Sequence, residues 1–322
     1  MRIGILGAAD IAYRRFLPSL LKSSCCTYAG VASRSPEKGE KFRQSYGGEV
    51  YDSYEALIAD ESIEAVYVPL PPALHYEWGR NVLEAGKHLL MEKPFTTNLQ
   101  NTEELLTLAA EKGLTVHENY MFLYHSQLAK IRDIIDGGEL GDIRLYRMAF
   151  GFPKRPGNDF RYVKALGGGA LLDCGGYPVR LATELLGDSA RVTQARLTQS
   201  EGYEVDLYGS AVLENNTGQC AQISFGMDNT YKCELEVWGS KGSVLADRIF
   251  TAPAGFAPKF DIFRNNVHEI LTQPDDDAFL RSIARFYDLC YDRKKREEAY
   301  RMLLRQSRLV EELRRLSQHE DS

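Results

Sequence analysis

The tripeptide Glu92-Lys93-Pro94 brings an acid, an amine and a rigid proline together directly after an apolar run that ends at Met91. If this run is a buried strand of a parallel sheet, Lys93 lies at the carboxyl end of the strand, where open α/β sheets bind ligands. A lysine in such a crevice can donate a proton or polarise a carbonyl group. The alternative is a strand that ends at a turn, with Lys93 in solvent and Pro94 acting only as a breaker.

The elements around the tripeptide favour the first interpretation. Up to about residue 118, short apolar runs alternate with amphipathic stretches, which predicts βαβ units and a parallel sheet covered by helices on both faces. In chain order these segments are Arg2–Leu6, Ile11–Leu21, Tyr28–Ala32, Glu37–Tyr46, Tyr54–Ile58, Ala65–Val68, Leu74–Ala85, His88–Met91, Thr102–Ala110 and Thr115–His117. Gly86 and Gly113 each follow a helical stretch, where a left-handed C-cap is expected.

Beyond Glu118 the pattern changes. A helix is expected near Leu128–Ile135 and a strand near Ile143–Phe150, and apolar and polar residues alternate strictly over Tyr231–Val237. This alternation is typical of an antiparallel sheet with one packed and one exposed face. The chain then returns to helical periodicity over Ala278–Tyr291 and Glu297–Leu316.

Composition narrows the functional classes. The 322 residues favour two domains, and 39 basic against 45 acidic residues give a net charge of −6, which argues against nucleic acid as a partner. No signal peptide and no membrane-spanning apolar run is expected, so we expect a cytoplasmic protein. The six cysteines and six histidines follow no metal-ligand spacing, and no metal is expected.

The turn after the first predicted strand partly matches the dinucleotide fingerprint G-x-G-x-x-G/A. Gly7 supplies the tight turn and Ala12 the close contact between helix and strand, while Ala9 stands where glycine normally lets the backbone approach a pyrophosphate. Asp10, followed by Ile11, can cap the helix, although its charge lies near an anionic cofactor. The position of the motif between a strand and a helix predicts a cofactor site.

Ser33-Arg34-Ser35 directly follows the second predicted strand, where an NAD-specific protein would present a carboxylate to the ribose hydroxyl groups. An arginine between two hydroxyls suits a 2′-phosphate, because the guanidinium provides several donors and a permanent charge. We therefore expect NADP(H) as the cofactor, in preference to NAD(H). The alternative is an exposed arginine at the start of a helix.

Five motifs in the expected order resemble the glucose–fructose oxidoreductase/inositol dehydrogenase/MocA family. They are Gly7-Ala-Ala-Asp-Ile-Ala12, Pro69-Leu-Pro-Pro-Ala-Leu-His75, Glu92-Lys-Pro94, Glu118-Asn-Tyr-Met-Phe122 and Gly167-Gly-Gly-Ala-Leu-Leu-Asp-Cys-Gly-Gly-Tyr177. Within the family, Phe160-Arg-Tyr162 and Phe225-Gly-Met227 are similar to nucleotide-sugar 3-ketoreductases. The resemblance implies an α/β fold, with a Rossmann domain over residues 1–118 and a substrate and oligomerisation domain over 119–322. The second domain is expected to contain a large, open, mainly antiparallel sheet and the C-terminal helices.

The resemblance also implies roles for individual residues. Lys93 matches the active-site lysine, Asp173 the acidic residue of the Gly-Gly-Gly helix, and Tyr177 stands where many members have a catalytic histidine. The tyrosine resembles the sugar ketoreductase and dihydrodiol dehydrogenase branches. The remaining expected cofactor contacts are Pro69, Leu70, His75, Glu92 and Asn119, and the expected substrate contacts are Phe160, Arg161 and Tyr162.

The chemistry follows from these residue types. Asp173 and Tyr177 are four apart on a predicted helix and are expected to share one face. An ammonium near the phenol favours its ionised form, and Lys93 is the candidate for that ammonium. During reduction, Tyr177 or Lys93 protonates the carbonyl oxygen, and Asp173 orients Lys93. The alternative interpretations are core packing for Tyr177 and local backbone bonding for Asp173 and His75.

The sequence thus predicts an NADP-dependent reductase of a ketosugar, with a nucleotide-linked sugar favoured. The second candidate is an NADP-linked dehydrogenase of free aldoses or dihydrodiols. A third, from another class, is a non-catalytic NADP-binding sensor, which would have no need of both Lys93 and Tyr177. The open sheet face of the resembling family predicts a homodimer or homotetramer.

Overall fold

The computed structural model describes residues 1–318 and divides the chain into two compact units. The first unit contains Met1–Met121 and Phe279–Leu304. The second contains Phe122–Ala278 and the chain from Arg305 on. No helix within residues 1–318 is long and apolar enough to cross a membrane.

The C-terminal helices are divided differently from the sequence-based expectation, which placed both in the second domain. Helix α8 (Ala278–Tyr291) and the first part of α9 (Arg293–Gln318) pack with the first unit. Leu303 lies in the hydrophobic core of that unit, and the Tyr300 hydroxyl donates a hydrogen bond to the carbonyl of Leu114. The apolar stripe of α9 is thus used by both units in turn, which the periodicity of the helix alone could not show.

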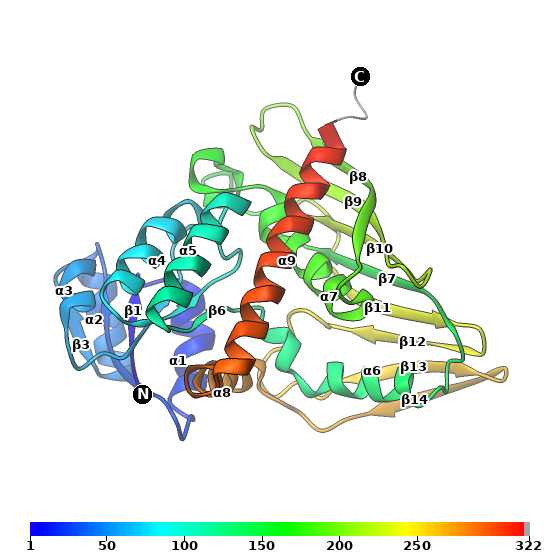
Figure 1. The fold of residues 1–322 in the computed structure, drawn as a ribbon, viewed down its shortest axis with the longest axis horizontal. Helices are drawn as coiled ribbons and strands as arrows, with labels where there is room; N and C mark the ends of the chain where they lie inside the picture. Colours follow the sequence, from blue (N-terminus) through cyan, green and yellow to red (C-terminus); the bar gives the residue numbers. More distant parts are fainter. Residues whose placement is uncertain (319–322) are drawn as a thin grey trace. The chain divides into compact units, whose positions relative to one another are not determined.

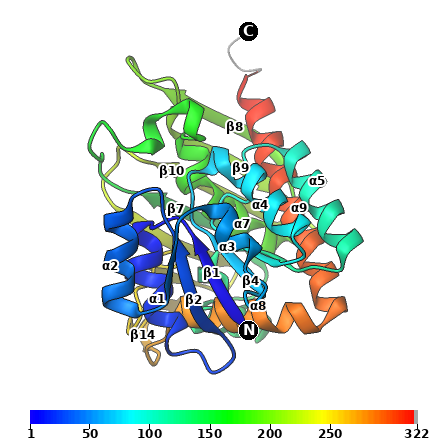
Figure 2. The same cartoon turned by 90° about the vertical axis from the view of Figure 1, so that its left-hand side faces the viewer.

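The first unit is built on a six-stranded parallel sheet in the order β3-β2-β1-β4-β5-β6 (Figure 1). Its strands are β1 Arg2–Leu6, β2 Thr27–Ala32, β3 Glu49–Tyr51, β4 Ala65–Val68, β5 His88–Met91 and β6 Val116–Glu118. Its helices before the domain boundary are α1 Leu17–Leu20, α2 Pro36–Tyr46, α3 Tyr54–Ala59, α4 His75–Glu84 and α5 Leu99–Lys112, with short turns η1 Ala12–Phe16 and η2 Pro72–Leu74. The turn η3 Met121–Tyr124 begins at the last residue of the first unit and continues into the second. Figure 2 shows β1, β2 and β4 side by side among these helices. The predicted βαβ alternation is confirmed, and the short β3 is an addition to it.

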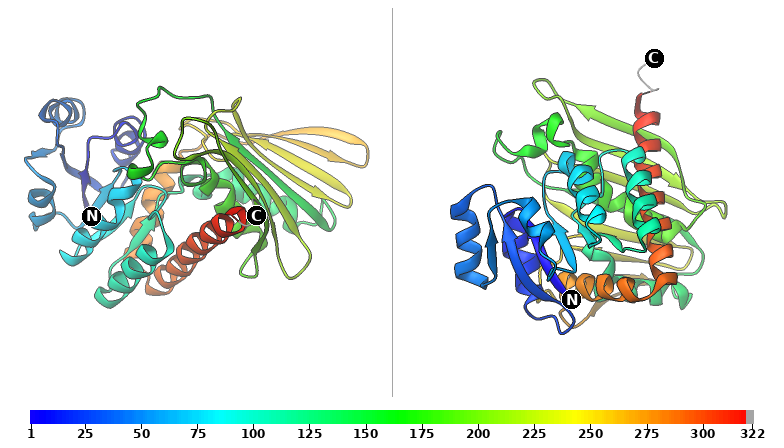
Figure 3. Two further views of the ribbon diagram at one scale, coloured as in Figure 1. Left: turned by 90° about the horizontal axis from the view of Figure 1, so that it is seen from above. Right: turned by 60° about the vertical axis from the view of Figure 1, so that its left-hand side comes forward.

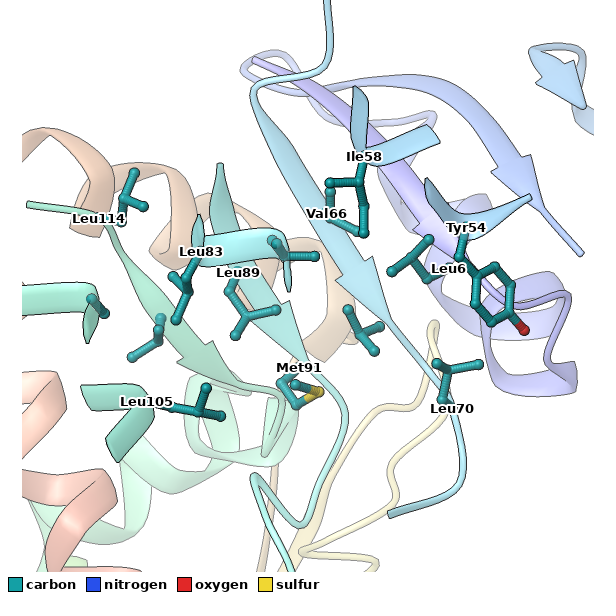
Figure 4. Close-up of a cluster of buried hydrophobic side chains, with 14 of the residues drawn as sticks. Leu6, Tyr54, Ile58, Val66, Leu70, Leu83, Leu89, Met91, Leu105 and Leu114 are labelled. Carbon is teal, nitrogen blue, oxygen red and sulfur yellow. The ribbon is translucent and has the colours of Figure 1, made fainter. Parts of the chain in front are cut away.

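Apolar side chains from three helices cover one face of this sheet (Figure 4). Tyr54 and Ile58 from α3, Leu83 from α4 and Leu105 from α5 pack on strand residues such as Leu89. Every residue of β4 and most of β5 are buried, as expected for parallel strands covered on both faces. Strands β1 and β4 are neighbours although they are not consecutive, which makes the carboxyl ends of these strands the point where such sheets bind ligands.

The second unit is built on an eight-stranded sheet in the order β14-β13-β12-β11-β7-β10-β9-β8. Its strands are β7 Ile143–Gly151, β8 Arg191–Gln199, β9 Asp206–Glu214, β10 Cys220–Gly226, β11 Lys232–Gly239, β12 Gly242–Asp247, β13 Lys259–Arg264 and β14 Val267–Thr272. The β7–β10 pair is parallel and the other pairs are antiparallel. Its helical elements are α6 Ser126–Asp136, η4 Phe160–Tyr162, η5 Lys164–Leu166, η6 Leu171–Gly175 and α7 Gly176–Leu186. Figure 3 shows α6 and α7 on one side of the sheet. The sheet is open and mainly antiparallel, as expected.

Two of the short turns, η1 and η6, are π-helical, and each precedes a proline within a helix. Pro18 and Pro178 carry no N–H, so the carbonyl four residues earlier loses its normal helical donor. In η1 the amide of Leu17 donates to the carbonyl of Ala12, which is the i→i+5 bond of a π-turn, and such turns are frequent at functional sites. The sequence predicted ordinary helices in both places, because helical periodicity does not distinguish the two patterns.

Candidate active site

The first unit contains a tight turn at the end of β1. Gly7 has a φ of 102°, and a Cβ atom at this position would lie 2.6 Å from Cδ2 of Leu70. The amide of Gly7 donates to the carbonyl of Ala32 over 2.8 Å, and the amide of Ala9 donates to the carbonyl of Gly7 over 2.9 Å. Only glycine combines this backbone with this close approach, so the first glycine of the predicted cofactor turn has a physical reason.

The residues after the turn begin the first helix. Ala12 is fully buried at the start of η1. Asp10 forms an exposed ion pair with Arg14 over 2.8 Å, one turn further along. This pair offsets the negative charge that Asp10 places near a phosphate site, although an exposed pair contributes little to folding.

Arg34 follows β2 and has a partner that the sequence did not indicate. Burial raises the pKa of Tyr54, and the charge and hydrogen bond of Arg34 oppose that rise, which places the guanidinium beside the phenol. The Tyr54 hydroxyl also lies 3.7 Å from the Cβ position of Gly7. Ser35 caps α2 by accepting a bond from the amide of Lys38 over 3.4 Å. The expected cation for a 2′-phosphate is therefore next to the turn that contains Gly7 and Ala9, which we call the phosphate turn.

Lys93 follows β5, and the acid before it is turned into the protein. Glu92 accepts bonds from the Tyr67 hydroxyl over 2.6 Å and from Asn119 over 2.7 Å. Asn119 in turn accepts a bond from the Ser282 hydroxyl over 2.9 Å. Burial raises the pKa of Glu92, while these hydrogen bonds and the charge of Lys93 oppose the rise. The side chains of Glu92 and Asn119 thus join the ends of β5 and β6 to α8, and their expected contacts with the cofactor stay predictions.

His75 was also expected beside the cofactor, but its side chain has no exposed surface. Its Nδ1 lies 2.7 Å from the carbonyl oxygen of Pro94, and its Nε2 lies 2.7 Å from that of Leu70. The two carbonyls favour a protonated ring, but burial is the larger effect and lowers the pKa of His75 to about 4. At neutral pH the ring is therefore uncharged and donates from one nitrogen.

The second unit carries Asp173 and Tyr177 on one continuous helical segment. Asp173 lies in the π-turn η6, and Tyr177 lies in α7. The four-residue interval therefore crosses a change in helical pitch, and the regular turn assumed from the sequence is wrong. Gly168 permits the chain before this segment to pass the carbonyl of Arg161, since a Cβ there would lie 2.4 Å from that oxygen.

Arg161 is the partner that the structure gives to Asp173. Its Nε donates to Asp173 over 2.7 Å, and its Nη1 donates to Asp159 over 3.1 Å. Burial acts to lower the pKa of Arg161, but the two carboxylates outweigh this and raise it. The guanidinium thus pairs with both Asp173 and Asp159, and a direct substrate contact of Arg161 stays a prediction. Orientation of Lys93 by Asp173 stays a prediction.

Tyr177 is surrounded by aromatic rings of its own unit. Its ring centroid lies 5.0 Å from Phe150, 5.8 Å from Phe122 and 6.0 Å from Phe250, and the residue is 7% exposed. The rings fix the phenol and limit the access of water to it. No motif predicted this environment, because its members come from separate segments of the chain.

The other residues expected to contact the substrate also make contacts within the protein. The Tyr162 hydroxyl donates to the carbonyl of Met227 over 3.3 Å and accepts from the amide of Arg155 over 2.9 Å. The guanidinium of Arg161 lies 4.6 Å from the ring centroid of Phe160. These contacts stabilise the segment before the Gly-Gly-Gly turn, and direct substrate contacts of Phe160 and Tyr162 stay predictions.

A Rossmann unit with a phosphate turn, joined to an open-sheet unit, defines an oxidoreductase that uses a nicotinamide cofactor. Residues 1–120 match the family model described as oxidoreductase family, NAD-binding Rossmann fold, and residues 128–245 match the GFO/IDH/MocA C-terminal domain. The chain belongs to the Gfo/Idh/MocA family of oxidoreductases, as the motifs predicted.

Several relatives share a more specific description. The chain is 39% identical over 314 residues to a dTDP-3,4-didehydro-2,6-dideoxy-alpha-D-glucose 3-reductase of Actinomadura kijaniata, covering 98% of this chain and 95% of the relative. It is 43% identical over 287 residues to an enzyme of the same description from Streptomyces violaceoruber, covering 89% and 84%. A solved 3-ketoreductase from A. kijaniata, in complex with NADP and TDP-benzene, superposes with a TM-score of 0.94 at 39% identity, covering 98% of this chain and 97% of that one.

Proposed function

We propose that this protein is an NADPH-dependent 3-ketoreductase that reduces a keto group of a dTDP-linked deoxysugar. The observation that carries the proposal is the match over nearly the whole chain to a 3-ketoreductase bound to NADP and TDP-benzene. The environment of Arg34 supports the choice of cofactor, because the guanidinium lies next to Tyr54 and close to the phosphate turn. A bidentate cation of this kind suits a 2′-phosphate.

Bound NADPH would supply the hydride, and the protein's own groups would place and protonate the substrate. Lys93 would polarise the carbonyl oxygen, and the phenol of Tyr177 would donate the proton. Phe122, Phe150 and Phe250 support this role for Tyr177, since they hold its ring and limit competing water. Lys93 remains the alternative donor.

Variants of the A. kijaniata ketoreductase support this pair. Crystal structures exist with one lysine replaced by alanine or glutamate, and with one tyrosine replaced by phenylalanine. These two positions are separated by the same interval along that chain as Lys93 and Tyr177 are here. The shared interval supports a correspondence of the two residues, and Asp173 would complete the set through its ion pair with Arg161.

The proposal is tested by following NADPH and NADH oxidation by the purified protein with dTDP-linked ketosugars, other nucleotide-linked ketosugars and free sugars. We expect turnover with a dTDP-linked 3-ketosugar and NADPH. Turnover only with free aldoses or dihydrodiols would favour the second candidate. Tight NADPH binding with no turnover across the panel would favour a sensor.

The proposal extends to assembly and location. The exposed face of the eight-stranded sheet carries Trp238, Phe263 and Ile270, which are 50%, 47% and 63% exposed, beside charges of both signs such as Arg147 and Glu236. A second copy of the chain would cover such a self-complementary face in a homodimer, or a homotetramer that contains it. We place the protein in the cytoplasm, and the absence of a disulfide bond within residues 1–318 supports this.

A further inference from the structure

The segment that carries Lys93 is held by side chains from several elements of the first unit. Glu92 is bonded to Tyr67 and Asn119, as described above. On the other side of Lys93, the amide of Phe95 donates to Oε1 of Glu118 over 2.7 Å. The carbonyl of Pro94 lies between these two anchors and faces the ring of His75.

His75 therefore touches two loops at once. Its Nδ1 faces the carbonyl oxygen directly after Lys93, and its Nε2 faces the carbonyl oxygen of Leu70, both at 2.7 Å. The side chain of Leu70 in turn covers Gly7, the glycine of the phosphate turn. A short chain of contacts thus runs from the phosphate turn through Leu70 and His75 to the carbonyl of Pro94, the residue after Lys93.

The proposed chemistry gives this chain of contacts a purpose. A lysine that polarises a carbonyl must be placed accurately relative to the cofactor, because small displacements lower the reaction rate strongly. The ring of His75 has no exposed surface, so it has no direct access to a substrate. Its effect on the reaction can only pass through the backbone that it holds.

We propose that His75 is a positioning residue for Lys93: it donates a hydrogen bond from Nδ1 to the carbonyl of Pro94 and so fixes the lysine segment relative to the phosphate turn. The inference rests on the proposed function, because it takes Lys93 to act on the substrate carbonyl. It assigns to His75 a role in turnover in place of the direct cofactor contact expected from the sequence.

Two conservative variants separate the two ring nitrogens. His75→Asn keeps an amide donor near the position of Nδ1, and His75→Gln keeps one near the position of Nε2. We expect His75→Gln to lower kcat by about 10- to 100-fold and His75→Asn by less than about fivefold, since only His75→Asn keeps the bond to Pro94. The dissociation constant of NADPH, measured by cofactor fluorescence, should change by less than about twofold in both variants.

His88→Gln is the matched control. The Nδ1 of His88 accepts a bond from the amide of Thr115 over 3.0 Å, at the amino end of β5, away from the end that Lys93 follows. This variant should lower the thermal stability without changing kcat by more than about twofold. An equal loss of kcat in His88→Gln and His75→Gln would mean that both histidines only stabilise the fold, and it would overturn the proposal.

A double-mutant cycle tests whether His75 acts through Lys93. His75→Gln should lower kcat in the otherwise unaltered protein and add little further loss to Lys93→Ala. If the losses of kcat in the two single variants multiply in the double variant, the proposal is contradicted. It is also contradicted if the kcat of His75→Asn is equal to or lower than that of His75→Gln. If His75→Gln does not fold, a loss above tenfold in folded His75→Asn would still refute it. Near-normal turnover of Lys93→Ala alone would remove Lys93 from the mechanism and overturn the positioning role of His75. Absence of turnover by the unaltered protein with every dTDP-linked ketosugar would instead reject the proposed function.

Discussion

The side chains proposed to act in the reaction differ in how much of their setting is local. Lys93 is fixed by its neighbours in the sequence, through Glu92, Pro94 and Phe95. Tyr177 is fixed by aromatic rings from distant segments. In both cases the side chains that hold the residue or its neighbours come from other elements, which is why sequence motifs identified both residues and described the surroundings of neither.

Cofactor preference tests the assignment of Arg34. The unaltered protein should bind NADPH more tightly than NADH by about 10- to 100-fold, the value of one or two charge-assisted bonds to the 2′-phosphate. Arg34→Ala should remove most of this preference, and Tyr54→Phe should reduce it less, because the cation remains. Titrations of cofactor fluorescence measure all three proteins. Equal affinities for both cofactors in the unaltered protein would reject this assignment.

Lys93→Ala should lower kcat far more than it weakens cofactor binding, because the ammonium acts on the reacting carbonyl. The expected loss is about 10²- to 10⁴-fold, the usual range for a group that donates or stabilises a proton. Lys93→Arg should not restore the rate, since arginine has a different shape and keeps its proton. Steady-state rates together with NADPH affinities decide the question, and near-normal turnover of either variant would remove Lys93 from the mechanism.

Tyr177→Phe removes one hydroxyl and leaves the aromatic cluster filled. Folding and NADPH affinity should persist, while kcat falls by about 10²- to 10⁴-fold if the phenol donates the proton. The pH dependence of kcat should lose one ionisation in this variant, and Asp173→Asn should displace that ionisation by changing the local charge. Identical pH profiles in both variants and the unaltered enzyme would indicate that Tyr177 only packs.

At the scale of elements, the site depends on turns that interrupt regular structure. The phosphate turn has Gly7 at a φ of 102°, and the helix of Asp173 begins with a π-turn before Pro178. Asp206 supports that helix start, since it accepts a bond from the amide of Leu171 over 2.7 Å. Burial raises the pKa of Asp206, while this bond opposes the rise.

Gly7→Ala tests the phosphate turn. A methyl group would strain the backbone and press on Leu70, so NADPH affinity should fall by at least about tenfold, as expected for 1–3 kcal/mol of local strain. Gly86→Ala is the matched control, because Gly86 also has a positive φ of 76° but nothing within 4 Å of its Cβ position. It should lower the melting temperature and leave NADPH affinity unchanged. Similar affinity losses in the two variants would argue against a specific role for the turn.

At the scale of the molecule, the open face of the eight-stranded sheet is the surface through which we propose that two copies of the chain assemble. Trp238→Glu places a charge on the apolar part of this face and next to Glu236, so it should shift a dimer or tetramer towards smaller species. Light scattering with size-exclusion chromatography measures the assembly over a range of protein concentration. An unchanged mass for this variant, or a monomeric unaltered protein, would contradict assembly through this face.

The sequence by itself determined the parallel sheet, the phosphate turn at Gly7 and the family, because these depend on local periodicity and on short motifs. It also identified Lys93 and Tyr177 as candidates. Only the tertiary structure placed α8 with the first unit, where Ser282 reaches Asn119. It alone also showed that His75 is buried between two carbonyls. The physical reason is that the partners of a buried polar group come from distant elements, and no local pattern records which elements meet.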